Sequence, residues 1–78
     1  MVSFRIGKVN TYYAKLKMMA VDLTADLHLA DEIIINSQVL KVRKIKVEYS
    51  EVDLGHKGET VVLNADFPVA IGDELVRT

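Results

Sequence analysis

The sequence predicts a small all-β domain, and three observations support this prediction. Hydrophobic and polar residues alternate along several short segments, which is the two-residue period of a strand with one buried face. Turn-forming residues separate these segments at intervals of about ten residues, as in small barrels and sandwiches. No segment fits a helical period better than the strand period. Because a chain of 78 residues forms one hydrophobic core, we expect a single domain spanning residues 1–78.

The first half of the chain contains two expected strands and a tight turn. Within residues 16–23, Met19, Val21 and Leu23 fall on one face and Ala20 and Asp22 on the other, which predicts a strand. A β-branched run at residues 33–35 predicts the next one. The segment before it has a helical option, but Leu27 and Leu29 alternate better as strand residues. Residues 36–37, an Asn-Ser pair, fit a two-residue hairpin turn.

The second half predicts a longer strand with an irregularity, followed by two short strands. Along residues 39–49 the hydrophobic phase slips by one at residues 43–44, which indicates a β-bulge. Residues 60–64 and 74–77 predict the last strands, each preceded by a turn that contains glycine. The expected core consists of Val9, Met19, Val21, Leu23, Ile33, Ile35, Val42, Ile45, Val47, Val61, Leu63, Val69, Ile71 and Leu75.

Six or seven strands of this kind predict a small closed β-barrel. The chain has no cysteine, which excludes disulfides and thiolate metal sites. The longest uninterrupted apolar run, residues 18–21, is far shorter than the roughly 20 residues of a membrane span. The first residues lack the apolar stretch of a signal peptide. We therefore expect a cytoplasmic protein without a membrane partner, and the initial methionine and final strand favour a complete stand-alone chain.

Five motifs, in this order and spacing, resemble domain II of elongation factor Tu and the other translational GTPases. They are IGKV at residues 6–9, LHLADEIII at 27–35, VRKIKV at 42–47, HKGETVVL at 56–63 and VAIGDELVR at 69–77. The resemblance implies a translation-factor barrel that contacts ribosomal RNA or transfer RNA. A similar barrel occurs at the C-terminus of collagenase-like peptidases, as an accessory domain beside the catalytic one.

One position departs from the pattern of this family. Ala30 stands where the family usually has glycine before aspartate. A non-glycine residue at positive φ costs about 1 kcal/mol, so we expect the turn to be reshaped or strained. The GxxxxGK[ST] motif of nucleotide-binding loops is absent, and we expect no nucleotide partner.

Two binding surfaces follow from the distribution of charges and hydrophobic residues. The net charge is −1, but the basic residues gather in two segments, residues 1–21 and 41–46, and a pair of adjacent tyrosines lies within the first. An exposed tyrosine among lysines is suited to stacking on an unpaired base, although an aromatic that anchors the hairpin within a solvated basic rim is the more common explanation of such a pattern. The candidate RNA-binding residues are Lys8, Tyr12, Tyr13, Lys15, Lys17, Arg43, Lys44 and Lys46. Met18 and Ile34 fall on the outward phase of their strands and are the candidate protein interface, for a larger protein or a second copy.

No set of residues predicts catalysis or cofactor binding. His28 has several acidic neighbours in sequence, but a bend expected at residues 24–25 separates them, and solvated turn residues explain the acids better than a metal site. No serine shows the surroundings of an activated nucleophile. We therefore expect a binding module that is not an enzyme and holds no metal or cofactor. Its alternative partner is a larger enzyme or factor onto which the barrel docks as an accessory subunit.

Overall fold

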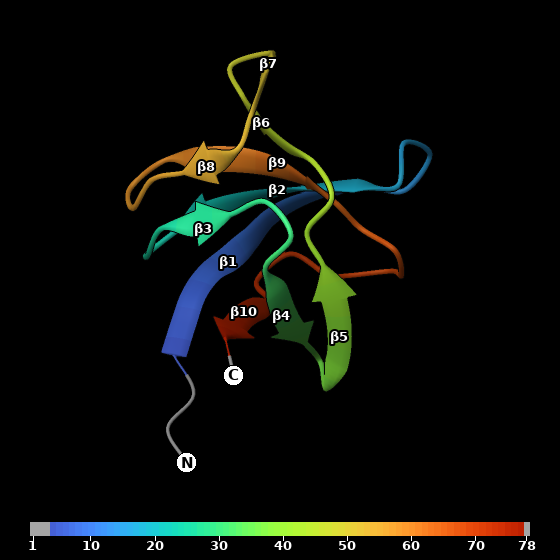
Figure 1. Ribbon diagram of the computed structural model, residues 1–78. Coiled ribbons are helices and arrows are strands. Elements are labelled where there is room, and N and C mark those ends of the chain that lie inside the picture. The colour runs from blue at the N-terminus through green and yellow to red at the C-terminus, as the bar shows by residue number, and fades with distance from the viewer. Residues whose placement is uncertain (1–3, 78) are drawn as a thin grey trace.

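The computed structural model describes residues 4–77, which form ten β-strands and no helix (Figure 1). The strands are β1 (Phe4–Tyr13), β2 (Met18–Leu23), β3 (Leu27–His28), β4 (Glu32–Ile35), β5 (Gln38–Lys41), β6 (Ile45–Val47), β7 (Ser50–Val52), β8 (Leu54–Gly55), β9 (Thr60–Asn64) and β10 (Glu74–Arg77). The all-β prediction is therefore confirmed. Within the described part of the chain, no helix is long and apolar enough to cross a membrane.

Eight of the strands form one curled antiparallel sheet in the order β5-β4-β10-β1-β2-β9-β6-β7, and β3 pairs only with β8. The prediction of a closed barrel of six or seven strands is wrong, because the large sheet is a half-barrel whose edge strands, β5 and β7, are not paired with each other. The segment expected as one bulged strand over residues 39–49 is in fact β5 and β6. Residues 42–44 connect β5 to β6, which lie near opposite ends of the sheet. Because three residues span only a short distance, the sheet is curled so that these two ends approach each other.

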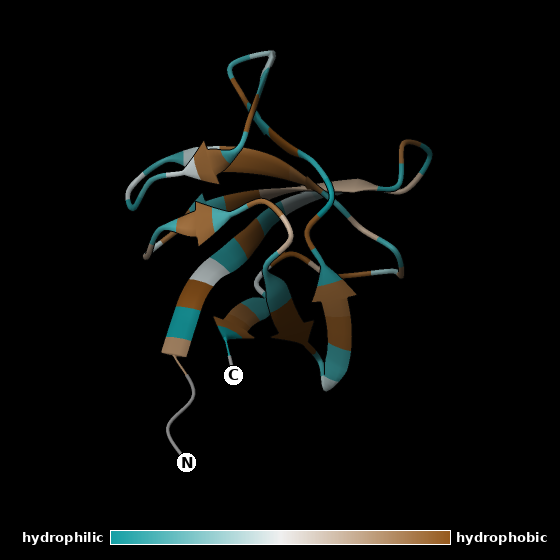
Figure 2. Ribbon diagram, viewed as in Figure 1, coloured by the Kyte–Doolittle hydropathy of each residue, from teal (hydrophilic) through white to brown (hydrophobic). Residues whose placement is uncertain are grey.

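The inner face of the curled sheet forms the hydrophobic core. Figure 2 shows hydrophobic residues concentrated in the strands and hydrophilic ones in the turns between them. Every expected core residue is buried except Val47, which is half-buried, and Ile71, which is 74% exposed. Ile71 is exposed because it lies in the turn before Gly72, whose φ is +96°. The core also contains Ile6, Ala20, Leu27, Leu40 and Ala65. Each fully buried aliphatic side chain contributes about 1.5–3 kcal/mol.

Several tight turns place non-glycine residues in the left-handed region. The predicted turn at residues 36–37 connects β4 and β5, and its φ angles are 52° and 67°. Ala30 has a φ of 73°, so the expected strain is present in this turn and Ala30 carries it. Residues 48–49 connect β6 and β7 in the same way, with φ angles of 49° and 72°. Positive φ at both central residues is the signature of a type I′ hairpin turn.

The crossover at residues 42–44 is held in place by the side chain of Asn64 at the end of β9. Its Oδ1 accepts hydrogen bonds from the backbone N–H groups of Arg43 and Lys44, at 2.8 and 3.3 Å. Its Nδ2 donates to the carbonyl oxygen of Lys41 and to Asp66, at 3.1 and 3.2 Å. Asn64 is 9% exposed, and these four bonds satisfy a polar group that burial would otherwise penalise.

Candidate docking surface

The outer face of strands β2, β9 and β6 carries a surface that joins two hairpins. In the sheet register Met18 lies between Tyr13 and Asn64, and the neighbouring row places Val62 between Ala20 and Lys46. The β1–β2 hairpin limits this surface at one end and the β6–β7 hairpin at the other (Figure 1). Two hollows of about 350 and 380 Å³ lie on it. We call it the hairpin surface, and it consists of Tyr13, Leu16, Lys17, Met18, Arg43, Lys44, Lys46, Glu48, Tyr49, Thr60, Val62 and Asn64.

Large hydrophobic side chains stand at both ends of the hairpin surface. Leu16 is 68% exposed at the tip of the β1–β2 hairpin, and Tyr13 is 42% exposed beside it. Tyr49 projects fully into solvent from the β6–β7 turn. Between them, Met18 and Val62 are half-buried, so they form an apolar floor. Sequence reasoning missed Tyr49 and Leu16, because a single exposed aromatic or leucine in a turn has no periodic signal.

The two tyrosines that the sequence singled out lie on opposite sides of β1. Tyr12 is half-buried and packs against the core, opposite Met19, whereas Tyr13 points outward opposite Met18. Only Tyr13 is therefore placed to meet a partner. The aromatic neighbour that completes the surface comes from a distant part of the chain, since Tyr49 lines the same hollow as Tyr13.

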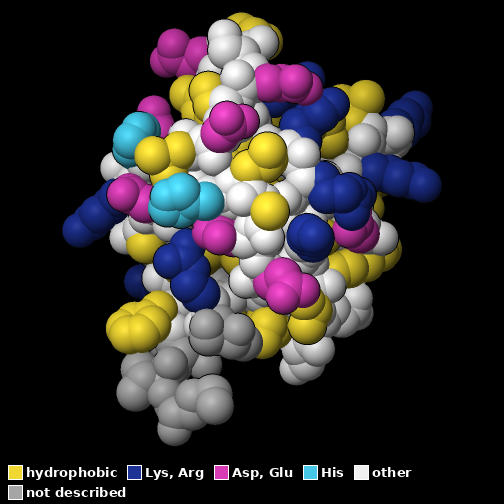
Figure 3. Space-filling view, in the orientation of Figure 1, with side chains coloured by type: hydrophobic (Ala, Val, Ile, Leu, Met, Phe, Trp, Pro, Cys, Tyr) yellow, Lys and Arg dark blue, Asp and Glu magenta, His cyan; other side chains and the backbone are white. Residues whose placement is uncertain are grey.

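The basic residues are only partly brought together. Lys17, Arg43 and Lys44 line one hollow, and Lys46 lines the other. Lys15 lies in the β1–β2 turn, while Lys8 lies toward the opposite end of β1, in register with Asp22 and Glu74. In Figure 3, several Lys and Arg side chains gather on the side of the molecule that holds the β1–β2 turn, while others lie beside the histidines on the opposite side.

Two of these cations are already ion-paired. Arg43 donates two hydrogen bonds to Asp66, at 2.5 and 2.7 Å. The Arg43 guanidinium thereby holds the pKa of the Asp66 carboxyl below its usual range. Lys44 pairs with Glu51 at 3.3 Å. Within residues 4–77, Lys15, Lys17 and Lys46 form no ion pair, so their positive charges remain available to a partner.

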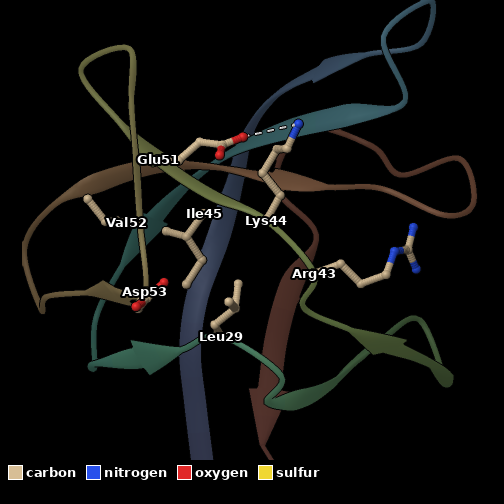
Figure 4. Close-up of a pocket in the computed structure, with 7 residues that line it drawn as sticks. All are labelled: Leu29, Arg43, Lys44, Ile45, Glu51, Val52 and Asp53. Carbon is tan, nitrogen blue, oxygen red and sulfur yellow. Dashed lines mark ion pairs between the residues drawn. The ribbon is translucent and has the colours of Figure 1, made fainter.

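A small third hollow of about 110 Å³ lies near the Lys44–Glu51 pair (Figure 4). In this view Lys44 and Glu51 point toward each other, whereas Arg43 points away toward the other side of the crossover. Leu29, Ile45 and Val52 supply its apolar wall. The hollow is too small for a drug-sized ligand, whose sites span about 300–1,000 Å³.

The histidines and acids considered as metal ligands do not form a cluster. Among residues 4–77, no group of three or more such side chains is arranged to hold a metal ion. Asp31 accepts a hydrogen bond from the backbone N–H of His28 at 2.9 Å and pairs with Arg77 at 3.1 Å. Glu59 accepts from the backbone N–H of His56 at 2.7 Å. These carboxylates stabilise turns.

The two candidate protein-interface residues lie on separate surfaces. Met18 is part of the hairpin surface. Ile34 is half-buried on the outer side of β4, in one cross-strand row with Val39 of β5 and Val76 of β10. Val39 is 63% exposed, so this row, which we call the edge row, is a second exposed apolar feature. Nothing in the sequence indicated that Val39 is exposed, because it stands beside Leu40 in a segment expected to be a strand.

The fold and these surfaces define the chain as a small half-barrel whose described residues offer contact surfaces and no metal cluster. Two solved structures with this fold come from a Geobacillus thermoleovorans protein assigned as a U32 peptidase. The selenomethionine variant of its C-terminal domain matches with a TM-score of 0.85 and 18% identity, over 96% of this chain and 99% of that one. A second structure of the C-terminal domain matches with a TM-score of 0.83 and 19% identity, over 92% and 88% of the two chains.

At these low sequence identities, the two structural matches establish a shared fold but not a shared function. No protein-family profile matches the sequence, and no curated protein matches it at a significant level. The resemblance to domain II of the translational GTPases is wrong, because the structures that match are domains of a peptidase-family protein. These motifs are not specific for one family. A Gly-Asp or Ala-Asp turn followed by an alternating strand is typical of many β-hairpins, and unrelated β-barrels are built from such hairpins.

Proposed function

We propose that this chain is a non-enzymatic docking module that binds a larger protein. The observation that carries the proposal is the fold match over nearly the whole of a domain that is itself one part of a larger protein. Such a domain works beside other domains, and a module of this fold is suited to docking on an enzyme or factor. The alternative role expected from the sequence, an accessory barrel, is thus the better supported one.

The surface of the molecule is consistent with this role. Seven large hydrophobic side chains among residues 4–77 are exposed, and the hairpin surface combines three of them with an apolar floor. Aromatic residues are enriched where proteins meet. A ribosomal or transfer RNA partner has no support from the fold comparison, and two of the predicted RNA-binding cations are neutralised by Asp66 and Glu51.

The test is affinity purification of the tagged protein from its native lysate after mild cross-linking, with one half of the sample treated with RNase. We expect one stoichiometric protein partner in both halves. Recovery of RNA that disappears after nuclease treatment would favour the RNA-binding alternative. A monomer that captures neither protein nor RNA, at concentrations where the cross-linker captures a known complex, would contradict the proposed function.

A further inference from the structure

We propose that the hairpin surface binds an acidic, extended segment of the partner protein, with Tyr13 and Tyr49 as the two side chains that grip it. This inference rests on the proposed function, because it names the surface and the chemistry of the partner. Three independent observations support it: a strained turn that presents Tyr49, an apolar floor between the tyrosines, and an excess of uncompensated lysines.

The β6–β7 turn is built from residues that suit it poorly. A type I′ turn prefers residues that tolerate positive φ, such as the Asn-Gly pair. The β4–β5 turn of this chain follows the preference in part, with Asn36 and Ser37, whereas the β6–β7 turn contains Glu48 and Tyr49. A left-handed residue with a side chain costs roughly 1–2 kcal/mol. Tyr49 makes no compensating contact with the core, since it is fully exposed. Folding therefore gives no reason for a tyrosine at this position, and this supports a role for Tyr49 in binding.

The floor of the surface is shaped for side chains of a peptide. Ala20 is buried and Met18 and Val62 are half-buried, so the floor is flat and apolar. Tyr13 and Tyr49 belong to the lining of one hollow of about 380 Å³, which accommodates one or two aliphatic or aromatic side chains. Buried tyrosines at the centre of an interface commonly dominate its binding energy.

The lysines of the hairpin surface favour a partner segment with negative charge. Lys17 and Lys46 line the surface without an ion pair in residues 4–77, and Lys15 lies in the adjoining turn. Glu48 is the one acidic residue among those that line the two hollows. At the far end, Asp22 accepts hydrogen bonds from Thr60 and Asn10, at 2.7 and 3.1 Å, and these bonds favour its ionised form. An acidic segment therefore gains attraction along the three lysines, which outnumber Glu48, when its acidic residues lie away from the Asp22 end.

A nucleic acid fits the same surface less well. Its phosphates would leave the apolar floor of Met18 and Val62 without partners. The two basic residues of the crossover, Arg43 and Lys44, already form ion pairs with Asp66 and Glu51. A protein segment satisfies both the floor and the lysines, and we therefore favour it.

The experiment uses a random peptide library displayed on phage and selected against the full chain. We expect enrichment of sequences that combine Asp or Glu with one or two aliphatic or aromatic residues. The most enriched peptide is then synthesised and titrated into isotope-labelled protein. Its chemical shift perturbations should lie at Tyr13, Lys46, Tyr49 and Val62, and not at the edge row. Enrichment of basic peptides, no enrichment, or tighter binding of an oligothymidine would overturn the proposal.

Tyr49→Gly separates binding from folding. Because glycine accepts a φ of 72°, this variant should unfold at a higher temperature than the parent, yet bind the selected peptide about tenfold more weakly or worse. Ser37→Gly is the matched control, since Ser37 has a φ of 67° in the other tight hairpin turn. It should raise the unfolding temperature similarly and leave peptide binding unchanged. Unchanged affinity in Tyr49→Gly would overturn the proposal, as would a lower unfolding temperature.

The outcomes also distinguish this inference from the proposed function. If purification captures a stoichiometric protein partner that Tyr49→Gly still binds and Val39→Glu does not, the docking module stands and the hairpin surface is wrong. If no protein partner is captured but the selected peptide binds as expected, the surface stands and the cellular role is wrong.

Discussion

The Oδ1 atom of Asn64 accepts a hydrogen bond from the backbone N–H of Arg43 at 2.8 Å, and through this bond the last residue of β9 holds the crossover between the two ends of the sheet. The same side chain also bonds Lys44, Lys41 and Asp66. No other side chain within residues 4–77 makes so many hydrogen bonds to the crossover and its flanks. The crossover positions one end of the hairpin surface, so stability and the candidate function share this anchor.

We predict that Asn64→Ala lowers the free energy of unfolding by about 2–3 kcal/mol, because it leaves partly buried backbone groups without partners. Urea denaturation measures this change. Asn10→Ala is the control, since Asn10 is exposed and its amide donates only to Asp22, and it should cost less than about 1 kcal/mol. Equal losses in the two variants would show that the anchor is unimportant.

A second prediction concerns acid stability and the Arg43–Asp66 pair. The hydrogen bonds from Arg43 lower the pKa of Asp66 in the folded state, so the unfolded state takes up a proton first as the pH falls. The contribution of the pair is therefore complete above about pH 4, the usual range of a carboxyl, and is lost as the pH falls through the lower folded pKa. Asp66→Asn should be less stable at neutral pH and lose less stability on acidification.

Denaturation series between neutral and strongly acidic pH test this expectation. Arg43→Gln should flatten the acid limb in the same way, because it removes the group that lowers the pKa of Asp66. The double variant should be no worse than the sum of the two single changes, since both remove one interaction. An acid limb in Asp66→Asn as steep as that of the parent would contradict the assignment.

A third prediction concerns the strained turn at Ala30. Ala30→Gly should raise the free energy of unfolding by about 0.5–1 kcal/mol, because relief of the left-handed strain outweighs the extra freedom of glycine in the unfolded chain. Ala14→Gly is the matched control, since Ala14 lies in the β1–β2 turn and its own φ is not positive. It should lower stability by about 0.4–1 kcal/mol. Thermal unfolding of both variants checks the opposite signs.

A fourth prediction compares two leucines that the sequence treated alike. Leu27 is fully buried and Leu29 is 39% exposed. Leu27→Ala should cost about 2–5 kcal/mol, the range for buried leucine truncations, and Leu29→Ala less than about 1 kcal/mol. Chemical denaturation of the pair provides the measurement. Similar losses would mean that Leu29 belongs to the core.

The leucine pair also shows which parts of the fold can be read from sequence. Alternation identified the long strands because a two-residue period persists for five or six residues in β2 and β9. The turn at residues 36–37 was predictable from its asparagine and serine. Strand β3 has only two residues, so the period that paired Leu27 with Leu29 ends before Leu29 is reached.

Other features depend on contacts that no local pattern encodes. The slip in the hydrophobic phase at residues 43–44 fits either a bulge within one strand or a break between two strands. Only the pairing of β6 with β9 shows that the strand is broken. The turn at Glu48 and Tyr49 contains neither glycine nor asparagine, so turn chemistry gave no signal for it. Among the residues that line the hairpin surface, the sequence singled out Tyr13, Met18, Lys17, Lys44 and Lys46, but not Tyr49. Its approach to Tyr13 depends on the curl of the sheet.

The pairing of the first and last strands has a practical consequence. Phe4 lies opposite Arg77 in the β1–β10 ladder, so a short linker could join the two ends, and new termini could be opened at residues 36–37 to give a circular permutant. β1 has ten residues and therefore separates Phe4 from Tyr13 by roughly 30 Å. Phe4 and Arg77 thus both lie far from the hairpin surface (Figure 1). A fluorophore, a bead or a second protein attached next to either residue would leave that surface open, which makes the chain convenient as an immobilised bait.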